Sequence, residues 1–186
     1  MAAKGVTVAA ARADLVARLN AVCAENIGPF PRAAIGIDGA VEGWLANGPA
    51  LAAEDNLRQA LASARIEDSR TGGAAAGPHK SDLRVRHAEK NIAADVCSTG
   101  EQKALLIAIV LADLRLLAGE RGAMPLLLLD EVVAHLDRHR REALYEEICA
   151  LGAQAWMTGT DAVLFAPLAD QAQHFSVDNA TIRPLN

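Results

Sequence analysis

The amino-acid sequence predicts an α/β fold in which helices pack on a parallel sheet. In its second half, short continuous apolar runs alternate with longer amphipathic segments, as expected for buried parallel strands joined by helices. Hydrophobic residues make up 52% of the 186 residues but aromatic residues only 3%, so Ala, Leu, Val and Ile must build the core. A chain of this length is sufficient for one main domain with a helical appendage.

The first half of the chain is expected to be mainly helical. Apolar residues recur at helical spacing over Val8–Glu25 and again over Glu54–Glu67, which predicts two amphipathic helices. The segment from Ile27 to Pro49 is rich in Gly and Pro, and its polar breaks do not indicate regular structure. Trp44 is expected to pack there as a satellite of the core. Alternating apolar and charged residues over Ser81–Glu89 predict a strand with one solvated face.

The second half of the chain has a more regular pattern. It predicts, in order, a long helix after Gly100, a strand over Pro125–Leu129, a helix over Arg138–Leu151 and a strand over Gln154–Thr158. Because the strands are continuously apolar, helices are expected to cover both faces of the sheet.

Charge and cysteine content restrict the classes of function. The formal net charge of −5 argues against a protein that coats nucleic acid over its whole surface, so any contact with DNA must be local. Three cysteines at irregular spacing indicate neither a disulfide framework nor a zinc cluster, which fits a reducing cytoplasm. Because the sequence has no secretory leader and no apolar stretch of about 18 residues, we expect a soluble cytoplasmic protein without membrane contact.

Two acidic residues follow the apolar run Leu126–Leu129. In parallel sheets, ligands bind at the carboxyl ends of the strands, where Asp130 could hold Mg²⁺ directly or through water and Glu131 could polarise an attacking water. An ordinary strand that ends in a polar turn has the same pattern. These residues alone therefore do not decide between a site and a turn.

A second candidate segment, Ser98–Lys103, leads directly into the long helix. Ser98 and Glu101 have the spacing of a capping box, in which each side chain bonds a free amide of the first helical turn. The same helix start suits a phosphate, because Gly100 allows close approach and the Ser98 hydroxyl, the backbone amides and the helix dipole favour an anion. The two interpretations are compatible.

The order and spacing of these segments resemble the RecF family of ABC-type ATPases. The resemblance rests on Ser98–Leu105 as the signature segment, Asp130–Asp137 as the Walker B and D-loop motifs, Thr158–Asp161 after the next strand, and Gly77–Asp82 upstream. It implies the C-terminal part of an ABC-type ATPase domain. A partial helical lobe would occupy residues 1–68, and the C-terminal half of the ATPase domain would occupy residues 69–186.

The resemblance also implies roles for individual residues. The residues that would contact the γ-phosphate of ATP held mainly by the opposing subunit are Ser98, Gly100, Glu101 and Gln102. Asp130 would act on Mg²⁺, directly or through water, and Glu131 would be the catalytic carboxylate. Asp137 would lie at the dimer seam, although it also has the position of an N-cap for the following helix. Thr158 and Thr160 stand where many ABC ATPases have a histidine sensor of the γ-phosphate, and their hydroxyls are candidates for that role. The absence of the histidine argues against a transporter subunit.

The implied function is DNA repair and recombination. A RecF-like protein would bind duplex DNA near single-strand gaps, form a homodimer when ATP is bound, and help RecO and RecR to load RecA in DNA replication, repair and the SOS response. ATP and Mg²⁺ are the implied cofactors, and hydrolysis is expected to be slow. One alternative is another chromosome-maintenance ATPase of the SMC type, although the chain lacks sustained heptads. The other is a non-catalytic dimerisation or partner-binding fragment.

The phosphate-binding loop of such ATPases has no counterpart in this sequence. No Gly-x-x-x-x-Gly-Lys motif and no Gly-Lys pair occur, so we expect no tight ATP binding by this polypeptide alone. We also expect Met1 to fall within the helical lobe. Other polar residues are weaker candidates: His135, His79 and Lys80 are expected in turns, and the basic cluster Arg138–Arg141 on a solvated helix face, with phosphate contact left open.

Overall fold

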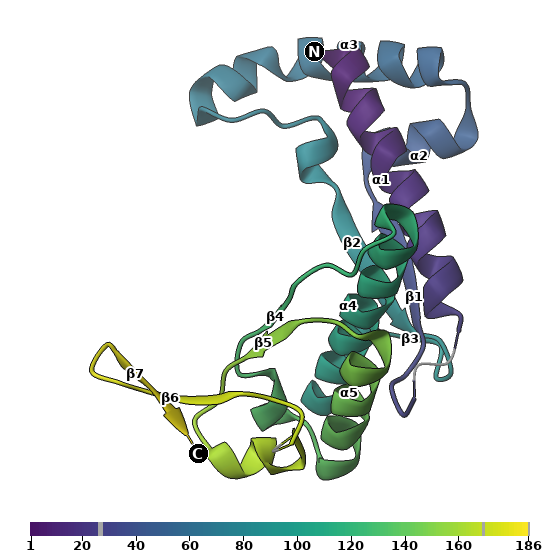
Figure 1. The fold of residues 1–186 in the computed structure, drawn as a ribbon. Helices are drawn as coiled ribbons and strands as arrows, with labels where there is room; N and C mark the ends of the chain where they lie inside the picture. The colour runs from purple at the N-terminus through teal and green to yellow at the C-terminus, as the bar shows by residue number, and fades with distance from the viewer. Residues whose placement is uncertain (26–27, 169, 186) are drawn as a thin grey trace. The chain divides into compact units, whose positions relative to one another are not determined.

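A computed structural model describes residues 1–25, 28–168 and 170–185, which form two compact units (Figure 1). Unit 1 comprises Met1–Ile27 and Pro31–Leu116, and unit 2 comprises Gly28–Phe30 and Leu117–Asn186. The boundary predicted after residue 68 separates the helical lobe from the ATPase domain of a complete ATPase. The two compact units of this chain are divided elsewhere and do not test it. That boundary stays a prediction.

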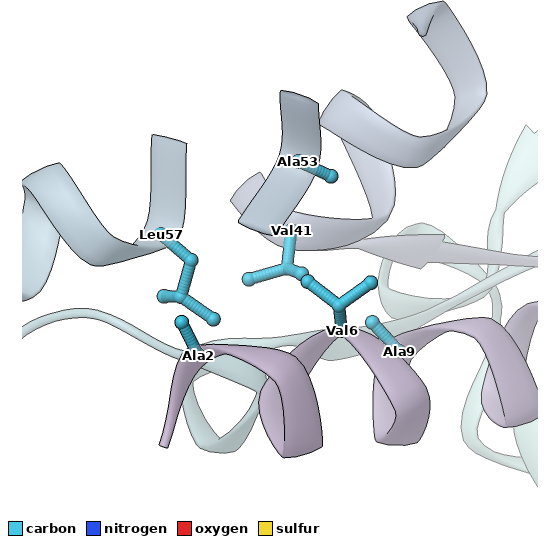
Figure 2. Packing of buried hydrophobic residues seen from close by; sticks show 6 residues of the cluster. All are labelled: Ala2, Val6, Ala9, Val41, Ala53 and Leu57. Carbon is cyan, nitrogen blue, oxygen red and sulfur yellow. The ribbon is translucent and has the colours of Figure 1, made fainter. Parts of the chain in front are cut away.

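Three helices pack together at the start of unit 1: α1 (Ala2–Cys23), α2 (Ala40–Asn47) and α3 (Ala50–Thr71). The side chains that they bury against one another are Ala2, Val6, Ala9, Val41, Ala53 and Leu57 (Figure 2). Gly5 lets α1 and α3 approach closely, because a Cβ atom at this position would lie 2.7 Å from Leu57 Cδ2. Trp44 packs against this cluster, as predicted.

Both predicted helices of the first half are present and longer than expected. The helix predicted over Val8–Glu25 begins at Ala2 and ends at Cys23, and the helix predicted over Glu54–Glu67 is extended at both ends. Alanine, which has the highest helix propensity, supplies much of the added length before Val8 and before Glu54.

Unit 1 also contains a three-stranded antiparallel sheet. Its order is β1 (Ala33–Asp38), β2 (Asp82–His87), β3 (Ile92–Ala93). The strand predicted over Ser81–Glu89 is confirmed by β2, but its predicted burial is wrong, because Leu83 is exposed and His87 is buried. The expectation of irregular structure from Ile27 to Pro49 is wrong, since β1 and α2 lie there; residues 26 and 27 are outside the described residues.

The strand β1 depends on tertiary contacts, because Ala and Gly have little intrinsic preference for strands. Its whole length pairs with β2, from Ala33 opposite His87 to Asp38 opposite Asp82. On α1, the Asn20 side-chain amide donates to the Ile35 carbonyl oxygen at 2.6 Å and accepts from the Ile35 N–H at 2.8 Å. Neither partner is close in sequence, which explains why the pattern gave no signal.

The long helix α4 (Thr99–Arg121) confirms the helix predicted after Gly100. Its first residues belong to unit 1, and its last five belong to unit 2. The side chains that it buries recur at helical spacing, and they are Ala104, Leu105, Ile107, Ala108, Leu111, Ala112 and Leu114.

Unit 2 contains a parallel β–α–β arrangement. β4 (Leu127–Leu129) pairs in parallel with β5 (Ala155–Met157), and α5 (Arg138–Leu151) lies between them in the chain. The helix has the bounds that the sequence predicts. It ends at Gly152, whose φ of 65° is the left-handed conformation that glycine adopts easily.

The expectation that helices cover both faces of the parallel sheet is wrong for the described residues. Leu127 and Leu129 are buried, whereas Leu128 is 70% exposed and its neighbour Trp156 is 59% exposed. Successive side chains of a strand point to opposite faces, so the sheet is buried on one face only. Within the described part of the chain, this sheet has two strands and no element that buries the other face.

A C-terminal hairpin of β6 (His174–Asp178) and β7 (Thr181–Leu185) was not foreseen from the sequence. Asn179 and Ala180 form its two-residue turn with φ of 46° and 59°, as the twist of a tight hairpin requires. Among the described residues, no helix has both the length and the apolar character to span a lipid bilayer.

Candidate functional site

The segment Ser98–Gln102 forms a capping box at the start of α4. The Ser98 N–H donates to Glu101 Oε2 at 3.0 Å, the Ser98 hydroxyl donates to the same oxygen at 2.9 Å, and the Glu101 N–H reaches Ser98 Oγ at 3.4 Å. The predicted capping box is therefore confirmed. It satisfies amides of the first helical turn that have no partner within the helix.

The carboxylate of Glu101 has an additional partner that sequence reasoning missed. Its Oε1 atom accepts a hydrogen bond from the ammonium group of Lys90. This bond, followed by the backbone and hydroxyl bonds from Ser98, lowers the pKa of Glu101 to about 2. No helical or strand spacing relates Lys90 to Glu101, so the sequence carries no periodic signal for the pair.

Gly100 and Gln102 differ in how the fold uses them. A Cβ atom added at Gly100 would meet no heavy atom within 4 Å, so packing inside the protein does not require glycine at this exposed position. The Gln102 side-chain amide donates to the carbonyl oxygens of Asp95 at 3.2 Å and Cys97 at 3.1 Å. Gln102 thus holds the preceding loop, whereas Gly100 leaves the helix start open.

Three sequence-predicted residues come together at the carboxyl ends of the parallel strands. The Thr158 hydroxyl donates to Asp130 Oδ1 at 2.5 Å and accepts from the Glu131 N–H at 3.0 Å. The Thr158 N–H donates to the Leu129 carbonyl oxygen at 3.0 Å, which continues the pairing of β4 and β5. Hereafter the acidic edge means Asp130, Glu131 and Thr158.

Glu131 has an unusual backbone conformation. Its φ is 53°, in the left-handed region that residues other than glycine rarely adopt. The hydrogen bond from its N–H to Thr158 contributes to holding this conformation. The chain therefore turns sharply where Asp130 and Glu131 leave the strand.

The segment after β5 also brings a glycine against an aromatic ring. A Cβ atom at Gly159 would lie 2.9 Å from Phe165 Cε2, so a larger residue here would displace the ring. Thr160 and Asp161 follow; Thr160 is exposed, and Asp161 Oδ1 accepts from the Val163 N–H at 2.9 Å. The structure thus joins Thr158 to the acids but gives Thr160 no comparable contact with them.

Asp137 is the N-cap of α5. Its Oδ1 atom accepts from the Arg140 N–H at 2.9 Å, so the N-cap interpretation is confirmed. The basic residues that follow are largely engaged within the helix: Arg138 pairs with Glu142 at 2.8 Å and Arg140 with Asp137 at 3.7 Å. The solvated face predicted for Arg138–Arg141 is confirmed only in part, because Arg138 and His139 are exposed whereas Arg140 and Arg141 are half-buried.

The other candidate residues, His79 and His135, lie in turns or at the surface. His79 Nε2 lies 2.7 Å from the Ala74 carbonyl oxygen within its turn, and His135 is exposed at the end of a short 3₁₀ segment. Within the described residues, no three His, Cys, Asp or Glu side chains cluster as metal ligands. The exposed carboxylate of Asp130 fits Mg²⁺ only as one ligand among waters and phosphates.

A capped helix start, a parallel strand that ends in two acids, and a β–α–β connection define the C-terminal part of an ABC-type ATPase fold. The chain superposes over its full length on two solved structures of the recombination mediator protein RecF in the RecFOR pathway, one named with ATP and the other with ATPrS. Both give a TM-score of 0.73 at 20% identity, and the match covers 49% and 48% of the respective RecF chains.

Curated proteins give the same result at higher identity. The chain is 48% identical over 186 residues to the DNA replication and repair protein RecF of Mesorhizobium japonicum, and 47% identical over 181 and 180 residues to the RecF proteins of Allorhizobium ampelinum and Brucella abortus. These matches cover 99%, 96% and 95% of the chain but 49%, 48% and 47% of the relatives. No family model matches.

Over nearly its whole length, the chain is therefore homologous to RecF, and it corresponds to the C-terminal half of that protein. It spans about half the length of the curated relatives that it matches.

Proposed function

We propose that this chain is part of a RecF-like DNA replication and repair protein and contributes two segments to its ATP sites. The relatives' names support the first part of the proposal, and the ATP and ATPrS in the names of the similar structures support the second. The observation that carries the proposal is the acidic edge, where Thr158 fixes two consecutive acids at the carboxyl ends of parallel strands.

In this proposal, the signature segment Ser98–Gln102 faces ATP that is held mainly by an opposing subunit. The open surface at Gly100 supports this role, because glycine inside a helix costs stability and the fold has no packing use for it here. Ser98 would contribute its hydroxyl, and the first turn of α4 would contribute its amides, toward the γ-phosphate. Glu101 would take part through the backbone of this first turn and Gln102 through its amide, while both side chains bond within their own segment.

The acidic edge would act on the phosphates and on water. Asp130 would hold Mg²⁺, directly or through water, which supplies charge neutralisation to the triphosphate. Glu131 would accept a proton from the attacking water. Thr158 holds the Asp130 carboxylate and the Glu131 backbone N–H, and Thr160 is the threonine left free for the sensor role. Asp137 would lie at the dimer seam while capping α5.

In the whole protein, ATP binding would drive homodimerisation, and slow ATP hydrolysis would return the dimer to monomers. The dimer would bind duplex DNA near single-strand gaps and would help RecO and RecR to load RecA. A role on bacterial DNA would locate the protein in the cytoplasm. Because this chain carries a net charge of −5 and two residues of its basic cluster, Arg138 and Arg140, are paired with carboxylates, most of the DNA contact would come from elsewhere in the complex.

A second candidate function follows from one observation. The chain contains no Gly-Lys pair and therefore no phosphate-binding loop of its own. Taken alone, it would then be a non-catalytic module that dimerises or binds a partner. The experiment below distinguishes this candidate from a contribution to ATP sites.

The test is ATP-dependent association of this chain mixed with the N-terminal half of Mesorhizobium japonicum RecF, measured by sedimentation velocity. We expect ATP to increase the dimeric fraction of the wild-type mixture and Ser98→Arg to abolish the increase, because the larger side chain occupies the place of the phosphate. The matched control, Ser63→Arg on an exposed position of α3, should behave as the wild type. ATP-independent association, or normal association of Ser98→Arg, would reject the composite site.

A further inference from the structure

Lys90 lies in the tight turn between β2 and β3, and this turn has a fixed shape. Asn91 has a φ of 53°, which asparagine tolerates better than most residues, and its N–H donates to the His87 carbonyl oxygen at 2.8 Å. The Arg86 guanidinium donates to the Asn91 side-chain oxygen at 3.0 Å. Lys90 is therefore presented from a rigid turn rather than from a long loop.

The residue before Lys90 anchors the same turn to β1. Glu89 Oε1 accepts from Arg32 Nε at 2.9 Å and from the Arg32 N–H at 3.2 Å. Partial burial raises the pKa of Glu89, but the hydrogen bonds from Arg32 outweigh it and hold the pKa below its ordinary value. The turn is thus tied on one side to the sheet, while the Lys90 ammonium reaches Glu101 on the other side.

Glu101 creates an electrostatic problem for the function proposed above. Its carboxylate lies against the Ser98 hydroxyl, which is the group expected to meet the ATP phosphates. A carboxylate at this place would repel a triphosphate, and its effect would be strongest where water is excluded. Lys90 is the cation bonded to this carboxylate, through the oxygen that Ser98 leaves unused.

We infer that Lys90 is a positioning residue for the composite ATP site: its ammonium neutralises Glu101 and holds the capping box, so that phosphates can approach Ser98 and Gly100. The inference rests on the proposed function. An exposed ion pair adds little to folding stability, and Lys90 retains 52% of its side-chain exposure. The effect should therefore fall on the ATP dependence of association rather than on folding.

The experiment titrates ATP into the mixture of this chain with the N-terminal half of Mesorhizobium japonicum RecF. Lys90→Ala should raise the ATP concentration for half-maximal association roughly threefold to tenfold, as expected for one uncompensated charge near a phosphate. Lys90→Arg should stay close to the wild type. Lys4→Ala, at an exposed lysine of α1, is the matched control and should have no effect.

A double variant separates charge neutralisation from a structural role. Glu101→Gln retains an acceptor for the Ser98 N–H but removes the negative charge, so adding it to Lys90→Ala should restore ATP-dependent association. In the chain alone, nuclear magnetic resonance should report a Glu101 pKa of about 2 that rises in Lys90→Ala. A structural role for Lys90 would predict no rescue.

Failure of the inference about Lys90 and failure of the proposed function would give different results. If Ser98→Arg blocks association but Lys90→Ala does not weaken it, or if Glu101→Gln does not rescue Lys90→Ala, the inference about Lys90 is wrong and the composite site stands. If the wild-type mixture shows no ATP-dependent association, the proposed function is wrong, and the role of Lys90 fails with it.

Discussion

The signature segment and the acidic edge reach a fixed geometry by different means. In the signature segment, Ser98 and Glu101 bond each other across three positions in one helical turn, and one ion pair is added from Lys90. At the acidic edge, Thr158 is separated from its partners Asp130 and Glu131 by 28 and 27 positions, and the pairing of β4 with β5 brings them together.

This difference determines how each region should respond to change. A helix cap is a local device, and its loss affects the first turn of one helix. A side chain that bridges two strand ends depends on the sheet, and its loss frees the Asp130 carboxylate and the left-handed backbone of Glu131 at once. We therefore expect changes at the acidic edge to alter ATP chemistry strongly and changes in the cap to alter stability modestly.

The largest effect is expected for Glu131→Gln in the mixture with the N-terminal half of Mesorhizobium japonicum RecF. The amide keeps the shape of the side chain but cannot accept the proton of water, so ATP hydrolysis should fall at least roughly 100-fold while ATP-dependent association persists. Single-turnover hydrolysis and sedimentation measure the two quantities. Glu146→Gln, at an exposed position of α5, serves as the control, and unchanged turnover in Glu131→Gln would remove its catalytic assignment.

Thr158→Val should have the next largest effect, because valine keeps the branched shape but supplies neither hydrogen bond. We expect hydrolysis to fall about tenfold and unit 2 to lose about 1–2 kcal/mol of stability. Thr158→Ser retains the hydroxyl and should recover most of both. If the valine and serine variants behave alike in hydrolysis and in urea unfolding, the hydrogen bonds of the Thr158 hydroxyl contribute to neither activity nor stability.

Ser98→Ala tests the local cap. Loss of the side-chain acceptor at the start of α4 should cost about 1 kcal/mol in the free energy of unfolding, measured by urea denaturation of the chain. Ser98→Thr retains a capping hydroxyl and should cost less. If Ser98→Ala lowers the free energy of unfolding more than Thr158→Val does, the expected order of the two regions is wrong.

The smallest expected effect is the pH dependence of the free energy of unfolding that Glu101 causes. The pKa of Glu101 is lowered from an ordinary 4.5 to about 2, chiefly by Lys90 and then by Ser98, so the folded state favours the ionised carboxylate. Its contribution to stability is fully present above pH 4.5 and is lost as the pH falls toward 2. Urea unfolding between pH 5 and pH 2 should show a smaller decline in Glu101→Gln than in the wild type; equal declines would contradict the assignment.

What the sequence could predict follows the same division. The bounds of α5 are marked by local signals, Asp137 as N-cap and Gly152 as C-cap, and they are correct. The capping box and the two acids after an apolar strand also have fixed local spacing. By contrast, β1 depends on pairing with β2 and on Asn20 from α1. Its Ala and Gly residues have low strand propensity, so the sequence pattern does not predict this strand.

The candidate site shows the same limit. The pair of Lys90 with Glu101 and the bridge from Thr158 to Asp130 join residues without a periodic relation, so only folding brings them into contact. The sequence predicts Thr158 as a candidate sensor of the γ-phosphate. Its hydroxyl proton is directed to Asp130, which favours a role in positioning the acids.

The central claim is that this chain contributes to an ATP site whose phosphate-binding loop it does not carry. Equilibrium binding of a fluorescent ATP analogue to the chain, with and without the N-terminal half of Mesorhizobium japonicum RecF, tests the claim most directly. We predict saturable binding only in the mixture. Tight binding by the chain alone would contradict the claim.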